Sequence, residues 1–362
     1  MASALKDIYN ELFIQKLIAS IKNEYPPFQG EEFFSAIFDE QWEQRTLKER
    51  MRHITLKLNE GLPEDYEESL DILMKVAPHF KHEDLAAIIF PDYVEVFGLE
   101  HWEPSLAALE HFTMYSTSEF AVRPFIIKDL GKMAKQMEHW AISSHASVRR
   151  LASEGMRPRL PWGVALQSLK KDPSPIMPIL ELLKKDESLY VRKSVANNLN
   201  DISKDHPQLV LALAEKWLGT HPNTDWIIKH ACRTLLKKGD PAALSLFGYS
   251  GAEGISVQNF RIENETIHIG GELLFSFAIT SERTEPTPIR LEYRIHYAKA
   301  LGKQSAKIFK ITENTISKDK PLLYKKKQSF KDMTTRKHYP GDHTISILIN
   351  GEEKAKLSFI VR

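Results

Sequence analysis

The stretch VRRLASEGM at residues 148–156 recurs as VRKSVANNL at 191–199 and as IIKHACRTL at 227–235. The offsets are 43 and 36 residues, close to the length of a HEAT-type helix pair, and a weaker copy begins at Val122-Arg123. In each copy the apolar positions follow a helical spacing, so they would face the neighbouring repeat. The pattern predicts an α-α superhelix of HEAT-like repeats.

The helical pattern extends back to the start of the chain. Residues 12–22, 41–58 and 66–76 carry apolar side chains three and four positions apart, and Pro and Gly lie between these segments. Asp186 and Asp225 are the expected starts of two repeat helices. We therefore predict a helical-repeat domain over residues 1–250.

The pattern changes after residue 250. Alternating, β-rich runs follow a linker at 247–252, and turn signals separate them; the runs are 272–279, 289–297, 306–311, 343–349 and 355–361. Asn350-Gly351 is a strong two-residue hairpin signal. About seven short strands over residues 257–362 predict an immunoglobulin-like β-sandwich domain.

Charge is distributed unevenly along the chain, although the net charge is only +1. Residues 1–110 hold 10 Lys and Arg against 22 Asp and Glu, whereas residues 111–256 hold 20 against 14 and residues 257–362 hold 19 against 12. A polyanion would therefore meet the middle and the end of the chain. Solvated faces of opposite sign would give the same counts.

Several classes of protein are disfavoured by composition. The single Cys232 excludes an internal disulfide framework and Cys-based zinc sites. We expect it to be a small buried side chain of the core. No apolar run is long enough for a membrane span or a signal peptide, so a cytoplasmic protein is expected. The His residues form no metal-ligand pattern, and neither a phosphate-binding loop nor a nucleophile elbow is present. We expect no metal and no organic cofactor.

Basic side chains recur on one face of the repeat helices. Residues four apart share a face, and equivalent positions in stacked repeats line one surface, which places Arg150, Lys193 and Lys229 in a row. Arg233 and Lys237 continue the third helix of this row. Such rows neutralise backbone phosphates without sequence preference. The alternative is a solvated face stabilised by an Arg150–Glu154 ion pair.

Two carboxylates lie beside this basic row, where they would oppose a polyanion. Glu154 and Asp201 could instead meet a cation, or stabilise an oxocarbenium-like sugar as a glycosidic bond breaks. Glu119 could approach the same surface. Trp162 lies in the proline-bounded loop RPRLPWG, where it could stack on a sugar or base, although a Trp after a helix is more often part of the core.

These residues carry a resemblance to a known family. The segments SVRRLASEGMRPRLPW (147–162) and SVANNLNDISKDHP (194–207) resemble the AlkC branch of the AlkC/AlkD DNA alkylation-repair glycosylases. The resemblance covers residues 1–250, and a C-terminal immunoglobulin-like domain fits some AlkC proteins. It implies excision of cationic alkylated bases, such as 3-methyladenine and 3-methylcytosine, from duplex DNA without base flipping, leaving an abasic site.

The resemblance also implies roles for individual residues. Glu119, Glu154 and Asp201 would be the active-site carboxylates, and Trp162 would pack against the sugar of the damaged nucleotide. The remaining candidates would hold DNA phosphates: Arg149, Arg150, Arg157, Arg159, Lys193, Lys229, Arg233 and the sandwich run Lys325, Lys326 and Lys327. A monomer acting on duplex DNA, without an obligate protein partner, is expected. A non-catalytic DNA-binding repeat protein and a protein-interaction scaffold remain the alternatives.

Overall fold

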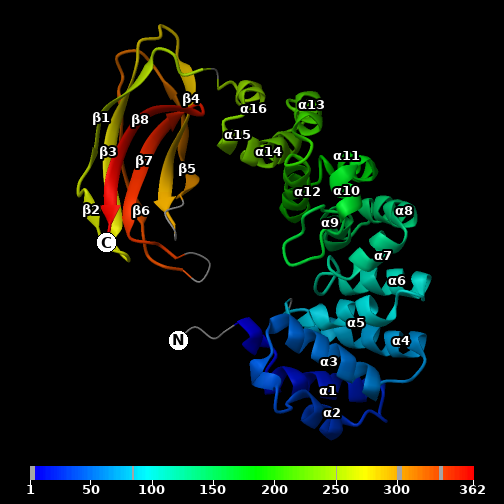
Figure 1. Ribbon diagram of the computed structural model, residues 1–362. Helices are drawn as coiled ribbons and strands as arrows, with labels where there is room; N and C mark the ends of the chain where they lie inside the picture. Colours follow the sequence, from blue (N-terminus) through cyan, green and yellow to red (C-terminus); the bar gives the residue numbers. More distant parts are fainter. Residues whose placement is uncertain (1–4, 84, 250, 300–303, 334–336) are drawn as a thin grey trace. The chain divides into compact units, whose positions relative to one another are not determined.

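A computed structural model describes residues 5–83, 85–249, 251–299, 304–333 and 337–362. It divides into two compact units (Figure 1). The first comprises residues 1–206 and 216–231, and the second comprises residues 207–215 and 232–362. The predicted division between residues 250 and 257 remains a prediction, since the second unit also contains α15, α16 and part of α13.

Helices make up the described part of the chain up to residue 246. The α-helices are α1 (Glu11–Glu24), α2 (Gly30–Ile37), α3 (Leu47–Gly61), α4 (Tyr66–Val76), α5 (Ile89–Phe97), α6 (Trp102–Phe112), α7 (Val122–Lys128), α8 (Leu130–Ala141), α9 (Ala146–Glu154), α10 (Gln167–Lys171), α11 (Met177–Leu183), α12 (Leu189–Ile202), α13 (Pro207–Trp217), α14 (Pro222–Ala231), α15 (Arg233–Lys238) and α16 (Pro241–Leu246). Short 3-10 helices are η1 (Leu5–Ile8), η2 (Trp42–Gln44), η3 (Ala77–Phe80), η4 (Ala86–Ile88) and η5 (Ser174–Ile176). None of the helices in the described ranges is both long and apolar enough to cross a membrane.

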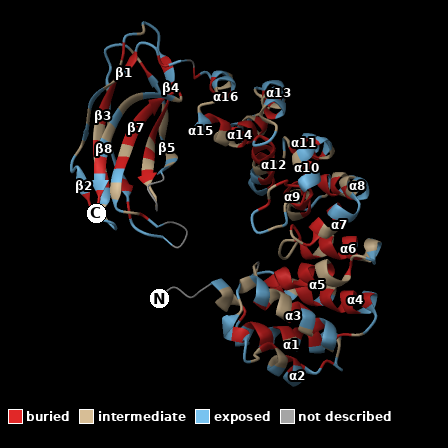
Figure 2. Cartoon of the chain, viewed as in Figure 1, coloured by how far each residue is buried: buried red, intermediate tan, exposed pale blue. Residues whose placement is uncertain are grey.

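The three aligned sequence copies form α9, α12 and α14, which stack in this order, with α12 packed against both of the others. Their shared apolar positions are buried, as the repeat predicts: Val148, Ala152, Val191, Val195, Ile227 and Ala231 are all at most 1% exposed. Figure 2 shows the same division into buried and exposed faces along the helices of the first unit. The predicted stack of helical repeats is confirmed.

Three local predictions need correction. The helix expected over 41–58 begins only at Leu47, because Thr46 and Glu49 form a capping box that starts a new helix after η2. The face expected to join Lys229 to Arg233 is interrupted, since α14 ends at Ala231 and α15 begins at Arg233. The two Asp helix starts are displaced: Ser188 is the N-cap of α12, and Asp225 lies within α14.

The second unit contains a β-sandwich. The strands are β1 (Ile255–Ile262), β2 (Thr266–Ile267), β3 (Glu272–Ser281), β4 (Thr287–Ala298), β5 (Gln304–Ile316), β6 (Leu322–Ser329), β7 (Gly341–Ile349) and β8 (Glu352–Val361). They form a three-stranded sheet in the order β1-β3-β6 and a five-stranded sheet in the order β2-β8-β7-β4-β5. Inward-facing side chains such as Phe275, Leu291 and Ile345 fill the core.

The predicted hairpin at Asn350-Gly351 joins β7 to β8 as expected. Both residues have positive φ, 49° and 82°, which a tight two-residue turn between twisted strands requires. The five predicted runs correspond to β3, β4, β5, β7 and β8. The alternation of apolar residues does not single out β1, β2 or β6: β6 contains the lysine run, only the first residue of β1 is fully buried, and β2 has only two residues.

Candidate active site

Three carboxylates lie near the termini of repeat helices, one before a helix and two in last turns. Glu119 is in the turn before α7, Glu154 is the last residue of α9, and Asp201 is the second-last residue of α12. The C-terminal end of a helix carries a partial negative charge, so the carboxylates of Glu154 and Asp201, each in the last turn of its helix, are electrostatically unfavourable. All three are nevertheless buried, with exposed fractions of at most 9%. Other polar and charged groups must therefore compensate for their burial.

Two arginines connect the three carboxylates into one ionic chain. Arg150 Nη2 lies 2.5 Å from Glu119 Oε2 and 3.5 Å from Glu154 Oε1. Arg157 Nη1 lies 2.6 Å from the same Glu154 oxygen, and its Nε donates to Asp201 Oδ2 at 2.9 Å. The predicted carboxylates are therefore brought together, by two of the residues that were predicted to bind phosphates.

Polar neighbours complete this chain at both ends. Thr117 Oγ1 donates to Glu119 Oε2 at 2.8 Å and accepts from Arg150 Nη1 at 3.0 Å. Lys204 Nζ donates to the second oxygen of Asp201 at 2.9 Å. Burial lowers the pKa of Arg150 and of Arg157, but the adjoining carboxylates raise each pKa by more, so both guanidinium groups have a pKa above the ordinary value.

Arg123 is a buried guanidinium behind this cluster, and it holds the loop between α9 and α10. It donates to the carbonyl oxygens of Gly155 at 3.0 Å, of Arg157 at 3.1 Å, and of Val164. Burial, reinforced by the charge of Arg157, lowers the pKa of Arg123 to about 10. Its donors thus fix the start and the end of the loop that carries Arg157 and Trp162.

Trp162 projects from this loop into solvent. The residue is 61% exposed, and its backbone adopts a φ of 65°, in the left-handed region that a Trp rarely occupies. Strained backbone conformations of this kind are concentrated at functional sites. The exposure agrees with the interpretation of Trp162 as a stacking residue rather than a core residue.

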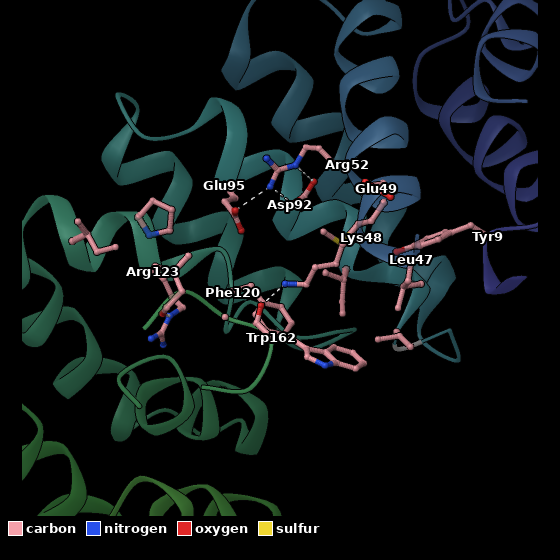
Figure 3. Close-up of a pocket in the computed structure, with 17 residues that line it drawn as sticks. Tyr9, Leu47, Lys48, Glu49, Arg52, Asp92, Glu95, Phe120, Arg123 and Trp162 are labelled. Carbon is pink, nitrogen blue, oxygen red and sulfur yellow. Dashed lines mark hydrogen bonds and ion pairs between the residues drawn. The ribbon is translucent and has the colours of Figure 1, made fainter. Parts of the chain in front are cut away.

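Trp162 also lines a cavity of about 350 Å³ between the loop and the N-terminal helices (Figure 3). Its walls include Tyr9 and Phe120, and an ion pair between Arg52 and Asp92 lies within it, with Arg52 Nη2 2.8 Å from Asp92 Oδ1. Lys48, on α3, reaches the Trp162 carbonyl oxygen. The N-terminal helices therefore contact the loop that carries Trp162, whereas none of the three carboxylates lines this cavity.

Two of the predicted phosphate-binding arginines have other partners. Arg149 is paired with Asp186 through Nε at 2.6 Å, and its Nη1 donates to the carbonyls of Ser143 and Ser144. It joins the start of α9 to the turn before α12. Arg159 makes a partly exposed pair with Asp205, with Nη2 2.6 Å from Oδ1. Arg159 lies closer to solvent than Arg149 and so is better placed for DNA.

The predicted lysines lie on the surface. Lys193 and Lys229 are exposed on α12 and α14, and Arg233 is partly buried in the second unit. In the sandwich, Lys325 is 2.7 Å from Glu263 and Lys327 is 3.0 Å from Glu272, while Lys326 lies exposed between them on β6. Whether these side chains touch DNA remains a prediction.

Several members of the site are not marked by any sequence motif. Arg123 stands out in the sequence only as part of a weak repeat copy, and the contacts of Lys48 and Lys204 come from tertiary packing. Tyr190 is a further example: the Arg150 guanidinium lies 4.7 Å from its ring centre, and the ring is half-exposed.

The fold and the site thus define a helical-repeat protein with buried, arginine-paired carboxylates at its helix ends. Residues 112–235 match the family model described as DNA alkylation repair enzyme, and residues 256–362 match the model described as the C-terminal Ig-like domain of the uncharacterised protein YhaZ. The uncharacterised protein YhaZ of Bacillus subtilis (strain 168) is 56% identical over 357 residues, which cover 99% of each chain.

A solved structure is similar over the same length. The alkylpurine DNA glycosylase AlkC of Pseudomonas fluorescens, bound to DNA containing an abasic site analog, matches with a TM-score of 0.96 and 36% identity. The match covers 99% of this chain and 100% of that one. The chain therefore belongs to the AlkC family of DNA alkylation repair enzymes. The predicted family and the immunoglobulin-like character of the sandwich are confirmed.

Proposed function

We propose that this protein is a monofunctional DNA glycosylase that hydrolyses the N-glycosidic bond of cationic alkylated bases in duplex DNA. The observation that carries the proposal is the chain of three buried carboxylates held by Arg150 and Arg157, together with the exposed Trp162 on the loop that also carries Arg157. Similarity to a glycosylase that was solved with abasic-site DNA supports the same reaction.

The carboxylates supply the chemistry that this reaction needs. Alkylation at a ring nitrogen makes the base cationic, so the base leaves with the bonding electron pair as a neutral molecule. Positive charge then develops on the C1′ carbon of the sugar, where fixed carboxylates stabilise it. A water molecule attacks C1′, and its proton passes to a carboxylate. The products are the free base and an abasic site.

The arginines explain how three acids can operate beside a polyanion. Arg150 and Arg157 neutralise the carboxylates that they touch, so the cluster repels the phosphates less than free acids would. Together with Lys204, which pairs with Asp201, the two arginines supply three positive charges against the three buried carboxylates when no substrate is bound. We assign Trp162 to contact with the sugar of the damaged nucleotide, and Arg159, Lys193 and Lys229 to the flanking phosphates.

The substrates that fit this mechanism are bases that already carry a positive charge. We propose 3-methyladenine and 3-methylcytosine, excised without rotation of the base into a pocket, by a monomer acting on chromosomal DNA in the cytoplasm. A neutral lesion is a poorer leaving group, so it would be excised slowly. The cluster needs no deep base pocket, because recognition rests on leaving-group ability.

The test is direct measurement of base release. The protein is incubated in excess with duplex DNA that contains 3-methyladenine, and the released base and the abasic strand are quantified. Release from this duplex, but not from undamaged DNA, is expected. DNA binding without release would instead support a non-catalytic binding protein, and absence of DNA binding at low salt would support a protein-interaction scaffold.

A further inference from the structure

Lys48 links the first helices of the chain to the loop that carries Trp162. Its ammonium donates to the Trp162 carbonyl oxygen and lies 5.0 Å from the centre of the Phe120 ring (Figure 3). Phe120 follows Glu119, the first carboxylate of the cluster. One exposed side chain therefore contacts both the stacking residue and the neighbour of a candidate catalytic acid.

Stability of the helix that carries Lys48 does not account for this placement. Lys48 is the second residue of α3, and a cation is unfavourable in the first turn of a helix. Thr46 and Glu49 form the capping box that satisfies this helix start. Lys48 contributes to neither cap bond, so its partners across the loop are its principal contacts.

The conformation of Trp162 requires such a contact. A φ of 65° is rare for a bulky residue, and it persists only where surrounding groups determine it. Arg123 holds the carbonyls at 155, 157 and 164, which fixes the loop on either side of Trp162. Lys48 holds the carbonyl of Trp162 itself, at the point where the backbone is strained.

We propose that Lys48 is a positioning residue, which acts on the glycosylase reaction through Trp162. This inference rests on the proposed function. In its absence the Trp162 backbone relaxes from the left-handed conformation, and the indole no longer meets the sugar next to the carboxylates. Because small misplacements of a positioning group reduce rates strongly, the effect falls on the chemical step.

The kinetic test is a double-mutant cycle between Lys48→Met and Trp162→Ala, read as single-turnover excision of 3-methyladenine. We expect Lys48→Met to lower the rate about tenfold in the natural background and less than about twofold in the Trp162→Ala background. Lys48→Arg, which retains a donor, should recover most of the rate. The matched control is Lys57→Met, which removes an exposed pair with Glu60 from the same helix.

A second measurement needs no activity. The chain has 6 Trp residues, so 5-fluorotryptophan labelling gives a set of ¹⁹F resonances in which Trp162 is assigned by Trp162→Phe. We expect Lys48→Met to shift and narrow the Trp162 resonance, and Lys57→Met to leave it unchanged. If the natural protein releases no base, the proposed function fails, whereas this readout still tests the link between Lys48 and Trp162.

Three results would overturn the proposal. Equal reductions of the rate in both backgrounds, with a smaller dependence of DNA affinity on salt, would make Lys48 a direct phosphate contact. An unchanged rate in Lys48→Met would remove any role for it. An unchanged Trp162 resonance in Lys48→Met would show that the loop keeps its conformation without the ammonium.

Discussion

Arg157 Nε donates to Asp201 Oδ2 across 2.9 Å, and both side chains are at least nine-tenths buried. The pair joins the loop after α9 to the last turn of α12, so it fixes two neighbouring repeats relative to each other. It also places a carboxylate where a helix end disfavours one. Replacing either partner therefore probes a different property of the site.

The charge of Asp201 is expected to matter for the rate and not for binding. Asp201→Asn keeps the size of the side chain but removes its negative charge and replaces one of its two acceptor oxygens with a donor. We expect the single-turnover excision rate to fall by about 100-fold or more, since the developing positive charge is no longer stabilised. DNA affinity should stay equal or rise slightly, because one repulsion of the phosphates disappears.

Glu154→Gln should behave in the same way as Asp201→Asn, and Asp71→Asn, in an exposed pair with Lys75 on α4, serves as the control. Rates come from single-turnover kinetics and affinities from fluorescence anisotropy with undamaged duplex. Reductions of rate and affinity that are equal in size would assign these carboxylates to binding and not to chemistry.

The guanidinium of Arg157 is expected to be a major contributor to stability. Arg157→Met leaves the buried acids Glu154 and Asp201 short of a partner, which typically costs about 3–5 kcal/mol of unfolding free energy. Arg159→Met breaks a partly exposed pair with Asp205 and should cost less than about 1 kcal/mol. Urea unfolding of the two variants compares their unfolding free energies directly. Similar destabilisation in both would show that the buried pair contributes no more to stability than the partly exposed one.

The sequence predicted the components of the site better than their connections. Glu154 and Asp201 were identified because the repeat register places them beside basic residues, and this register depends only on local periodicity. Arg150 and Arg157 were assigned to phosphates, although the structure pairs them with the acids. The carbonyls that Arg123 binds lie over 30 residues away in the chain, and no local pattern encodes such contacts.

The strands show the same limit. Alternating apolar residues predicted β3, β4 and β7, whose inner faces are buried, and Asn350-Gly351 predicted a turn that requires two positive φ angles. Strand β6 was not predicted because its middle is three consecutive exposed lysines, and of its residues only Leu322, Tyr324 and Gln328 are buried or partly buried. A strand can be predicted from the sequence when one of its faces is buried, because that burial produces an alternation of apolar and polar residues.

The backbone of Trp162 yields a prediction that separates stability from function. Trp162→Gly removes the strain of a φ of 65°, which Gly adopts readily. We expect the unfolding free energy to stay the same or rise by about 1 kcal/mol. The excision rate should fall by as much as it does in Trp162→Ala, because both variants lack the indole. Thermal unfolding and single-turnover kinetics measure the two effects, and a substantial loss of stability in the Gly variant would contradict the assignment of strain.

Cys232 is buried, and burial raises its pKa to about 11. At about pH 8 the folded protein should therefore hold this group as the thiol, whereas the unfolded chain has an appreciable thiolate fraction. We expect iodoacetamide to modify the folded protein slowly at this pH, and to modify it quickly in denaturant, as followed by mass spectrometry. Rapid modification of the folded chain would contradict the interpretation of Cys232 as a structural core residue.

The lysines of β6 provide the test for DNA binding by the sandwich. Lys325 and Lys327 form exposed pairs with Glu263 and Glu272, and such pairs exchange readily for phosphates. For every phosphate that a variant no longer neutralises, the slope of log affinity against log salt concentration falls by about 0.9. For the triple change of Lys325, Lys326 and Lys327 to Gln, we therefore expect the slope to fall by about one to three, with the excision rate at saturating protein unchanged.

The control replaces Lys57 and Lys75, on α3 and α4, with Gln, which leaves the slope unaltered. If the β6 variant also retains the full slope, the duplex does not touch this strand, and the basic surface that binds DNA is confined to the helical repeats.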